Sequence, residues 1–282
     1  MAGAVGKLYV VATPIGNLED ITLRALRVLK EADLIAAEDT RRTKKLLNHY
    51  GVKTPMVSYH AHSPGSRAEE LIGRMREGQT VALVSDAGTP GFSDPGADLV
   101  ARAWEAGVKV EAVPGPAAAV AALSLSGFKG DVTFVGFLPR GEGRRVRLLQ
   151  ELAGENRVFI IFESPRRAVR TLTEIAGAMP DRKVLVVREL TKKFEECWRG
   201  PAPQVAARLA GAELKGEVAL VLSCPVAPAA PAVDLKARLL AAARDTGLTG
   251  RRLAEAVAAA LQVPWRRAYQ AYLALKEEKQ LP

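Results

Sequence analysis

Short apolar runs alternate with amphipathic stretches over the first 126 residues of the chain. The apolar runs lie at residues 8–12, 34–37, 55–59, 81–84 and 108–113, and each has the length of a buried strand. The stretches that follow them predict helices at residues 23–32, 43–50, 67–78, 97–106 and 117–126. Strands that alternate with helices pack as a mostly parallel sheet, so this part of the chain predicts an α/β fold.

The pattern changes beyond residue 130. Strand-like runs lie at residues 132–138, 158–162, 184–190, 194–199 and 218–223. The connection at residues 189–193 is short enough for a hairpin, so we expect some of these strands to pair antiparallel. We therefore predict an α/β domain at residues 1–116 and a second α/β domain, with a mixed sheet, at residues 117–223.

A third region follows at the carboxyl end. Residues 224–233 are rich in Pro and Ala and predict an extended linker. Residues 234–282 then show amphipathic patterns at 235–244, 249–261 and 264–276, which predict a small helical domain of helix–turn–helix type. Its last helix carries Arg266 and Arg267, which suit contact with nucleic acid, beside aromatic residues that equally suit packing inside the domain.

Composition narrows the class of protein. The 282 residues are 48% hydrophobic and 25% charged, the ordinary balance of a globular protein in water. No apolar run approaches the ~18 residues of a membrane span, and the run at residues 8–12 is too short for a signal peptide. Cys197 and Cys224 lack metal-type spacing, and a third ligand beside His60 and His62 is not evident. We expect a cytoplasmic protein with neither a membrane partner nor a metal.

The basic residues are clustered. The chain has a formal net charge of +9, with eight Arg against four Glu at residues 140–170 and nine basic against four acidic residues at 236–279. Such clusters suit a polyanionic partner, although solvated faces have the same composition. Forked guanidinium groups bind phosphates well. The candidates for phosphate contacts in a nucleic acid are Arg41, Arg42, Arg140, Arg144, Arg145, Arg166, Arg266 and Arg267.

The most unusual stretch is the loop at residues 85–96. It follows a buried strand and contains three Gly and two Pro, which exclude both helix and strand. Open α/β sheets bind ligands at the carboxyl ends of their strands. Small residues let a ligand approach the backbone, and Asp86 adds a carboxylate. Because the chain has no Gly-x-Gly-x-x-Gly, P-loop or nucleophile-elbow motif, the ligand is not expected to sit in one of those sites.

Seven short motifs follow one another over nearly the whole chain. They are Thr13-Pro-Ile-Gly-Asn-Leu-Glu-Asp20, Ala37-Glu-Asp-Thr-Arg41, Ser85-Asp-Ala-Gly-Thr-Pro90 with Ser93-Asp-Pro-Gly96, Pro114-Gly-Pro116, Gly136-Phe-Leu-Pro139, Glu163-Ser-Pro165 and Glu189-Leu-Thr-Lys192. In this order they resemble the ribosomal RNA small-subunit methyltransferase I family, within the tetrapyrrole methylase superfamily. Two positions differ from the family pattern, because Ala117 stands where Ser is common and Arg166 where His is common.

The resemblance implies a fold, a cofactor and a substrate. It implies two α/β domains with S-adenosylmethionine in the cleft between them, and a homodimer. It also implies methyl transfer to the ribose 2′-oxygen of a cytidine in the decoding region of 16S ribosomal RNA. The residues that it implies for the cofactor are Pro14, Ser85, Asp86, Ala87, Gly88, Pro90, Gly91, Phe92, Pro114, Gly115, Ala117, Ala118, Glu163, Ser164, Thr191, Val218 and Ala219.

The chemistry of such a transfer limits the catalytic candidates. A ribose hydroxyl is a poor nucleophile and needs a proton acceptor or a stabilising cation. The candidates at strand ends are Glu38, Asp39, Asp86, Glu189 and Lys192. We expect Asp86 near the cofactor and either Asp39 or Lys192 near the hydroxyl. For Asp39, a role as helix cap is an equal reading.

Two further questions stay open in the sequence. An extruded base could stack on Tyr59, Phe92 or Phe137, although each ring also suits core packing. The alternative function is methylation of a small tetrapyrrole, since one fold serves several substrates. The basic clusters and the terminal helices favour RNA, because a small porphyrinoid would need neither. A non-catalytic nucleic-acid-binding protein would leave the loop at residues 85–96 unexplained.

Overall fold

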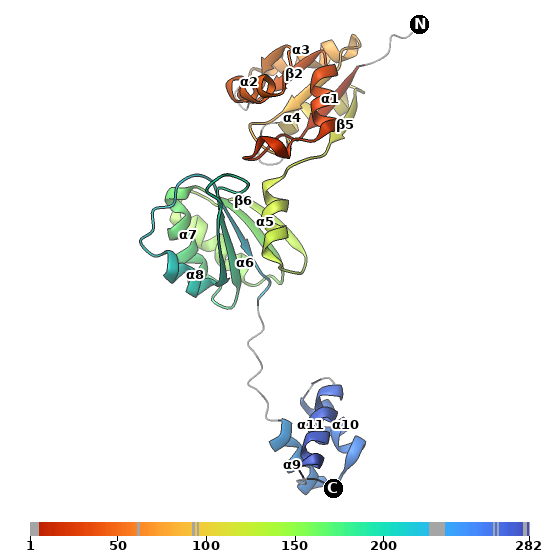
Figure 1. Cartoon of the computed structure of the whole chain (residues 1–282), viewed down its shortest axis with the longest axis vertical. Helices are drawn as coiled ribbons and strands as arrows, with labels where there is room; N and C mark the ends of the chain where they lie inside the picture. Colours follow the sequence, from red (N-terminus) through yellow and green to blue (C-terminus); the bar gives the residue numbers. More distant parts are fainter. Residues whose placement is uncertain are drawn as a thin grey trace. The chain divides into compact units, whose positions relative to one another are not determined.

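The computed structural model describes residues 6–60, 63–91, 94, 96–225, 235–261, 263, 265–278 and 281. The chain divides into two compact units, residues 1–226 and residues 227–282 (Figure 1). The larger unit holds both sheets and the smaller unit holds the terminal helices. Within the described ranges, no helix is long and apolar enough to cross a membrane.

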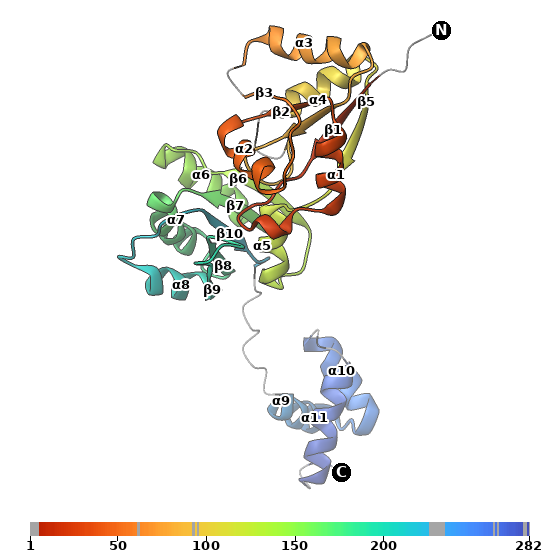
Figure 2. The ribbon, with the colours of Figure 1, turned by 45° about the horizontal axis from the view of Figure 1, so that its top comes forward.

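The first sheet is parallel throughout the described residues. Its strands are β1 (Lys7–Val11), β2 (Leu34–Ala37), β3 (Met56–Ser58), β4 (Val81–Val84) and β5 (Lys109–Val113), in the order β3-β2-β4-β1-β5. Helices α1 (Leu23–Glu31) and α2 (Thr40–His49) pack on one face. Helices α3 (Gly65–Arg76) and α4 (Gly96–Glu105) pack on the other, and the 3₁₀ helix η1 (Leu18–Asp20) precedes α1 (Figure 2). The parallel order brings the carboxyl ends of these strands to one edge.

The second sheet is mixed. Its strands are β6 (Val132–Phe137), β7 (Val158–Glu163), β8 (Lys183–Arg188), β9 (Glu196–Pro201) and β10 (Val218–Leu222), in the order β6-β7-β10-β8-β9. Among the described strands of this second sheet, only β6 and β7 pair in parallel. Helices α6 (Glu142–Ala153), α7 (Pro165–Ala178) and α8 (Ala202–Leu209) pack on one face, and α5 (Ala118–Ser126) packs on the other.

The terminal unit is a three-helix core in its described part. Helices α9 (Leu235–Thr246), α10 (Gly250–Leu261) and α11 (Trp265–Glu277) surround Leu239, Leu253 and Leu275, whose side chains are fully buried. Tyr269 stacks between the rings of Trp265 and Tyr272. This aromatic row packs α11 inside the unit while Trp265 stays 37% exposed.

The predicted α/β fold class is confirmed, with two differences. The strand predicted at residues 184–190 ends at Arg188, because Glu189 and Thr191 adopt φ angles of 52° and 66°, outside the strand region. The following turn delays the next strand until Glu196, and β8 and β9 form the expected antiparallel hairpin. Helices α6, α7 and α8 are a second difference, because the sequence pattern predicts only strands in this region. The domain boundary between residues 116 and 117 stays a prediction.

Candidate active site

Acidic side chains follow two neighbouring strands of the first sheet. Glu38 and Asp39 follow β2, while Ser85 and Asp86 follow β4, which pairs with β2. The backbone N–H of Asp86 donates to Oε2 of Glu38 over 3.1 Å, and the backbone N–H of Asp39 donates to Oδ1 of Asp86 over 2.9 Å. These reciprocal bonds fix the two carboxylates side by side at the carboxyl edge of the sheet.

The loop after β4 is built by turn chemistry. Its Gly88 exchanges two backbone hydrogen bonds with Thr13, of 2.9 and 3.0 Å. Gly88 and Gly91 have φ angles of 80° and 86°, which side chains other than glycine rarely adopt. Oδ1 of Asp94 accepts the N–H groups of Gly91 and Gly96, each at 2.8 Å, where α4 begins. These bonds fix the backbone at Gly88, Gly91 and Gly96 in the described part of the loop.

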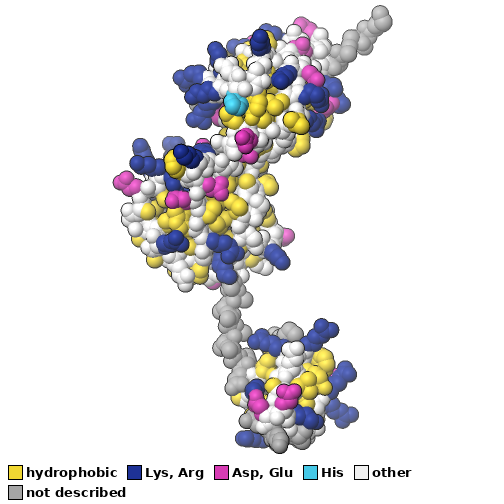
Figure 3. Space-filling view, viewed as in Figure 1, with side chains coloured by type: hydrophobic (Ala, Val, Ile, Leu, Met, Phe, Trp, Pro, Cys, Tyr) yellow, Lys and Arg dark blue, Asp and Glu magenta, His cyan; other side chains and the backbone are white. Residues whose placement is uncertain are grey.

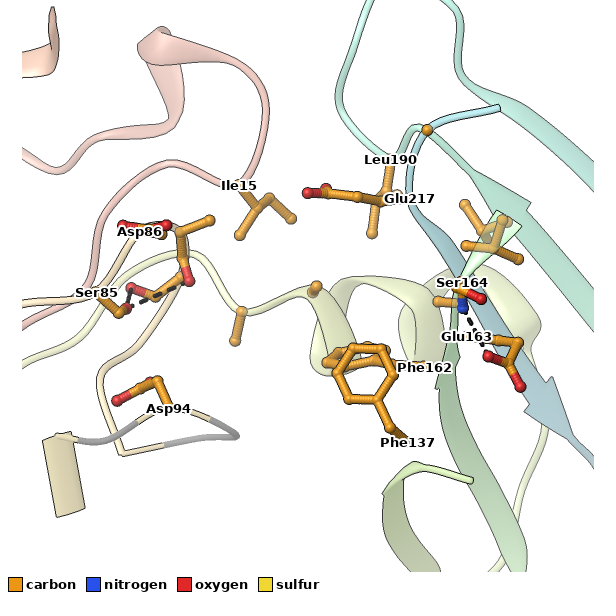
Figure 4. Close-up of a pocket in the computed structure, with 18 of the residues that line it drawn as sticks. Ile15, Ser85, Asp86, Asp94, Phe137, Phe162, Glu163, Ser164, Leu190 and Glu217 are labelled. Carbon is orange, nitrogen blue, oxygen red and sulfur yellow. Dashed lines mark hydrogen bonds between the residues drawn. The ribbon is translucent and has the colours of Figure 1, made fainter. Parts of the chain in front are cut away.

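A cavity of about 370 Å³ lies against this loop. Figure 4 shows Asp86, Asp94 and Ile15 on one side of it, with the second sheet's residues facing them. Pockets for small organic ligands commonly span about 300–1,000 Å³. The remaining lining residues are Glu38, Arg42, Ser85, Ala87, Gly88, Thr89, Ala117, Ala118, Phe137, Phe162, Glu163, Ser164, Pro165, Val187, Leu190, Gly216, Glu217, Val218 and Ala219.

The charge of the lining is predominantly negative. Glu38, Asp86 and Asp94 line the cavity from the first sheet, and Glu217 lines it from the second. Arg42 is the single basic residue among the described lining residues, and its Nη1 lies 3.3 Å from Oδ2 of Asp86. Burial, and then the charges of Asp86 and Asp94, raise the pKa of Glu38. The cavity is therefore suited to a ligand that carries positive charge.

Glu163 lines the cavity but is already fully used by the protein. It is 2% exposed, and its carboxylate accepts the N–H of Ser164, Nε of Arg167 and Oγ1 of Thr171 at 2.7, 2.8 and 2.9 Å. Ser164 is the N-cap of α7. Glu163 therefore fixes the start of α7 and the lining backbone beside it, and its carboxylate has little capacity left for a ligand.

The residues predicted for the cofactor fall into four groups. Those that line the cavity are Ser85, Asp86, Ala87, Gly88, Ala117, Ala118, Glu163, Ser164, Val218 and Ala219. Pro14 lines a smaller neighbouring cavity that shares Ser85 and Asp86 with the first. Those that line neither are Pro90, Gly91, Pro114, Gly115 and Thr191. Phe92 lies outside the described residues.

Two of the five catalytic candidates line the cavity, and Asp39, Glu189 and Lys192 do not. Glu38 and Asp86 line it. Asp39 is instead the N-cap of α2, where its Oδ1 accepts the N–H of Arg41 over 2.8 Å, and this bond lowers the pKa of Asp39. The cap is thus observed, and a carboxylate with a lowered pKa is a weaker proton acceptor, while a position of Asp39 near the hydroxyl stays a prediction.

Lys192 is held by two carboxylates, and its catalytic role stays a prediction. Its Nζ donates to Oε1 of Glu189 over 2.9 Å and to Oε2 of Glu217 over 3.0 Å. Burial opposes the charged form of Lys192, but these two bonds raise its pKa above the ordinary lysine value. Its positive charge is therefore neutralised within the second sheet's loops, and the side chain does not line the cavity.

The arginines predicted for phosphate contacts also divide. Arg42 lines the cavity, and the exposed members are Arg41, Arg140, Arg144, Arg166, Arg266 and Arg267. Arg145 is a correction, because it is 3% exposed and forms a bidentate pair with Glu174, with contacts of 2.5 and 2.7 Å. A buried, paired guanidinium cannot reach a phosphate without breaking that pair.

Sequence reasoning missed several lining residues. They are Ile15, Asp94, Phe162, Pro165, Val187, Leu190, Gly216 and Glu217. Ile15, Asp94, Pro165 and Leu190 do belong to the motifs quoted above, so their motifs were the available signal. Gly216 and Glu217 directly precede β10, opposite the end of β7, which only the antiparallel pairing reveals. No group of three His, Cys, Asp or Glu able to hold a metal occurs within the described ranges, and His62 lies outside them.

Comparison with known proteins places the chain in a family. Residues 7–206 match the model of the Tetrapyrrole (Corrin/Porphyrin) Methylases. A relative from Thermotoga maritima, named ribosomal RNA small subunit methyltransferase I, is 49% identical over 220 residues, which cover 78% of this chain and 99% of the relative. The chain belongs to the ribosomal RNA small subunit methyltransferase I family. A second member, from Synechocystis, is 43% identical over 279 residues, or 97% of this chain and 100% of that one.

Solved structures show that this family shares its fold with tetrapyrrole methylases. Cobalt precorrin-4 methyltransferase has a TM-score of 0.59 at 19% identity, covering 79% of this chain and 96% of that one. Uroporphyrin-III C-methyltransferase from Thermus thermophilus, in complex with S-adenyl homocysteine, has a TM-score of 0.55 at 22% identity, covering 77% of this chain and 97% of that one. At these identities the likeness shows the fold alone.

Proposed function

We propose that the chain transfers a methyl group from S-adenosylmethionine to the ribose 2′-oxygen of a cytidine in the decoding region of 16S ribosomal RNA. Membership of the ribosomal RNA small subunit methyltransferase I family supports the RNA substrate. The observation that carries the chemistry is the pair of Glu38 and Asp86 on the wall of an acidic cavity.

The cavity suits the proposed methyl donor. S-adenosylmethionine supplies a methyl group on a positively charged sulfonium, and the electron pair of the broken bond stays on sulfur. Glu38, Asp86 and Asp94 present negative charge to such a cation. The backbone of residues 85–88 and the small side chains of Ala117, Ala118 and Ala219 would hold the rest of the donor.

Glu38 is the residue best placed to take the hydroxyl proton. It lines the cavity, and its raised pKa brings it closer to the working pH than an ordinary glutamate. As the ribose oxygen gains the methyl group, its proton passes to a carboxylate oxygen of Glu38. Asp86 orients Glu38 by donating its backbone N–H, so we assign Asp86 to positioning and to the donor's charge.

Basic surface residues supply the contacts to RNA in this proposal. Arg42 lies on the cavity wall, and Arg140, Arg144 and Arg166 are exposed beside the second sheet's lining segments. In the terminal unit, Lys and Arg side chains project around an apolar area on the face shown in Figure 3. That unit includes the exposed pair Arg266 and Arg267. Cationic clusters of this kind bind the phosphate backbone without reading sequence.

We also propose that two copies of the chain associate. Helix α5 consists of Ala, Val and Leu apart from Ser124 and Ser126, and its Val120 and Leu125 are 65% and 48% exposed. Val132 of β6 is 46% exposed. Exposed apolar groups on a helix that covers a sheet face favour contact with another protein surface. Light scattering should give the mass of a dimer for the wild type, and the Val120→Glu and Leu125→Glu double variant should shift it to a monomer.

The proposed function is tested with ribosomal subunits. Small subunits prepared without the modification are incubated with labelled S-adenosylmethionine, and the 2′-O-methyl group is mapped by primer extension at low nucleotide concentration. We expect one labelled cytidine in the decoding region, and no label with the Glu38→Gln variant. Label on a base carbon or nitrogen would contradict the proposed chemistry. Methylation of an added uroporphyrinogen instead of RNA would favour the tetrapyrrole alternative.

A further inference from the structure

The structure separates the three aromatic residues considered for stacking. Tyr59 is 4% exposed, and its hydroxyl donates to Oδ2 of Asp98 over 2.9 Å. Phe92 lies outside the described residues. Phe137 is 61% exposed and lines the cavity (Figure 4). An apolar ring that is both exposed and part of a binding cavity is available to a ligand from solvent.

A bulge at the end of β6 presents Phe137. The pairing of β6 with β7 shifts register between Phe134 and Gly136, and Gly136 has a φ of 73°. A bulge redirects the side chains that follow it. The ring of Phe162 meets Phe137 edge to face at 5.8 Å and Phe134 at 5.1 Å, so Phe137 rests on an aromatic base.

Two arginines fix the backbone directly after Phe137. Nη1 of Arg145 donates to the carbonyls of Pro139 and Arg140 at 3.4 and 3.1 Å. Nη2 of Arg167 donates to the carbonyl of Leu138 at 3.2 Å. Each arginine is itself held by a carboxylate, Glu174 for Arg145 and Glu163 for Arg167. The segment after Phe137 is thus preorganised, which reduces the entropy lost when a ligand binds to the ring.

The surroundings of Phe137 distinguish a nucleobase from the methyl donor. The donor's charge is matched by the carboxylates of the first sheet, whereas Phe137 lies on the second sheet's side of the cavity. Arg140 and Arg144 follow Phe137 closely in the chain, and Arg166 follows the lining residue Pro165. All three are exposed and form no ion pair within the described ranges. Exposed aromatic rings with cationic neighbours are the usual platform for unstacked bases in single-stranded RNA.

We propose that Phe137 stacks on the pyrimidine ring of the nucleotide to be methylated and holds its ribose toward Glu38. This inference rests on the proposed function, because it assigns a contact to the same RNA substrate. The flat ring would give affinity through stacking, and Arg140 and Arg144 would hold the flanking phosphates. Arg145, which does not reach solvent, acts here as a positioning residue through the carbonyls of Pro139 and Arg140.

The test compares substitutions that separate ring stacking from apolar volume. The variants are Phe137→Ala, Phe137→Leu and Phe137→Tyr, with Phe194→Ala as a matched control. Phe194 is 65% exposed but does not line the cavity. Steady-state methylation gives KM and kcat for small subunits, and calorimetry gives Kd for S-adenosylmethionine. Light scattering reports the oligomeric state of each variant.

Loss of stacking should change KM for the small subunit and leave Kd for the methyl donor unchanged. Phe137→Ala and Phe137→Leu should raise KM for the subunit by about tenfold and leave Kd for S-adenosylmethionine unchanged. Phe137→Tyr and Phe194→Ala should match the wild type. An unchanged KM in Phe137→Ala, a weakened donor Kd, or a change of oligomeric state would each overturn the inference. A wild type that leaves the RNA unmethylated would instead overturn the proposed function, and the inference with it.

Discussion

Oδ1 of Asp86 accepts the backbone N–H of Asp39 over 2.9 Å, although the two residues are 47 positions apart in the chain. The bond joins the end of β4 to the start of α2, across the edge where the sheet meets the cavity. Asp86 therefore has two roles. Its Oδ1 connects the two loops through a hydrogen bond, and its carboxylate places negative charge on the cavity wall.

Substitution of Asp86 should separate these roles. The amide oxygen of Asp86→Asn can still accept the N–H of Asp39, so we expect an unchanged melting temperature and a donor Kd raised about tenfold through the lost charge. Asp86→Ala also loses the hydrogen bond, which costs about 1 kcal/mol and lowers Tm by about 2–4 °C. Calorimetry and thermal melts measure both effects, and the exposed Asp20→Asn serves as control. Wild-type donor affinity in Asp86→Asn would contradict the role in charge.

The pH dependence of the reaction should report Glu38. Burial raises its pKa in the folded chain, and only the deprotonated carboxylate accepts a proton, so the single-turnover rate should rise with pH through a midpoint above the ordinary value of about 4.3. Glu38→Gln should remove this limb and slow the transfer about 10²–10⁴-fold. The exposed Glu105→Gln is the control. A limb that persists in Glu38→Gln would assign the base elsewhere.

The raised pKa of Glu38 also makes stability depend on pH. A rise in pH should speed the transfer but lower the stability of the folded chain. A carboxyl with a pKa raised by folding binds its proton more tightly in the native state. Its contribution to stability is complete below the pKa of the unfolded chain and is lost as pH rises through the folded pKa. Glu38→Gln should therefore melt at a higher temperature than the wild type at pH 8, and the difference should shrink on acidification. A fall in Tm at pH 8 would contradict this.

Gly16 is the point where the loop after β1 meets the loop after β8. A Cβ at Gly16 would lie 2.5 Å from Cγ of Lys192 and 2.9 Å from the carbonyl oxygen of Leu190. Since Ile15 and Leu190 both line the cavity, Gly16→Ala should displace its walls, weaken donor binding and cost about 1–3 kcal/mol of stability. Calorimetry and urea unfolding test this. Gly73 lies in α3, where an added Cβ would meet nothing within 4 Å beyond its chain neighbours and the backbone of its own helix. Gly73→Ala should therefore stabilise by about 0.5–1 kcal/mol.

Arg182 is a buried guanidinium that binds carbonyls. It is 1% exposed, and its Nη1 and Nη2 donate to the carbonyls of Arg157, Ser223, Leu152 and Glu155. Lysine has one nitrogen and no planar fork, so Arg182→Lys leaves carbonyls unpaired. We expect a loss of about 2–4 kcal/mol in urea unfolding. The exposed Arg208→Lys should change stability by less than about 0.5 kcal/mol, and equal effects of the two substitutions would contradict this account.

The terminal unit should contribute salt-dependent affinity. Arg266 and Arg267 are exposed on α11, and each phosphate contact adds about 0.7–0.9 to the slope of log K against log salt. Replacing both with Gln should reduce that slope by about 1–2 and leave Kd for S-adenosylmethionine unchanged. Filter binding to small-subunit RNA at several salt concentrations measures it. An unaltered slope would remove this pair from the RNA interface and leave only the packing reading for α11.

Local sequence was sufficient for the strands and for the cavity-forming loop. Strand β4 and the Gly and Pro residues that follow it are adjacent in the sequence. The pattern alone therefore predicts that Ser85, Asp86 and Gly88 belong to a ligand-binding loop, and all three line the cavity. Parallel strand order then brings Glu38 to Asp86 through β2 and β4. The family resemblance, and not the local pattern, predicts Ala117 and Val218, which line the other side of the cavity.

Pairing between distant side chains could not be predicted in this way. Arg145 lies in an arginine-rich stretch and resembles its neighbours, but it meets Glu174, 29 residues away, and is buried. Lys192 likewise pairs with Glu217, 25 residues away. Helix α6 was overlooked because its charged residues suggested a surface cluster and obscured the buried Leu149 and Leu152. Exposure, which distinguishes Phe137 from Tyr59, is likewise a property of the folded chain.

The bulge in β6 at Gly136 affects how molecules can associate as well as how Phe137 is presented. Strand β6 is at the border of its sheet, where unpaired N–H and C=O groups could recruit a strand from another molecule. The shift between Phe134 and Gly136 interrupts that row of groups. Continuous sheet extension across two molecules is thereby disfavoured, so the exposed border of this sheet is protected from open-ended aggregation.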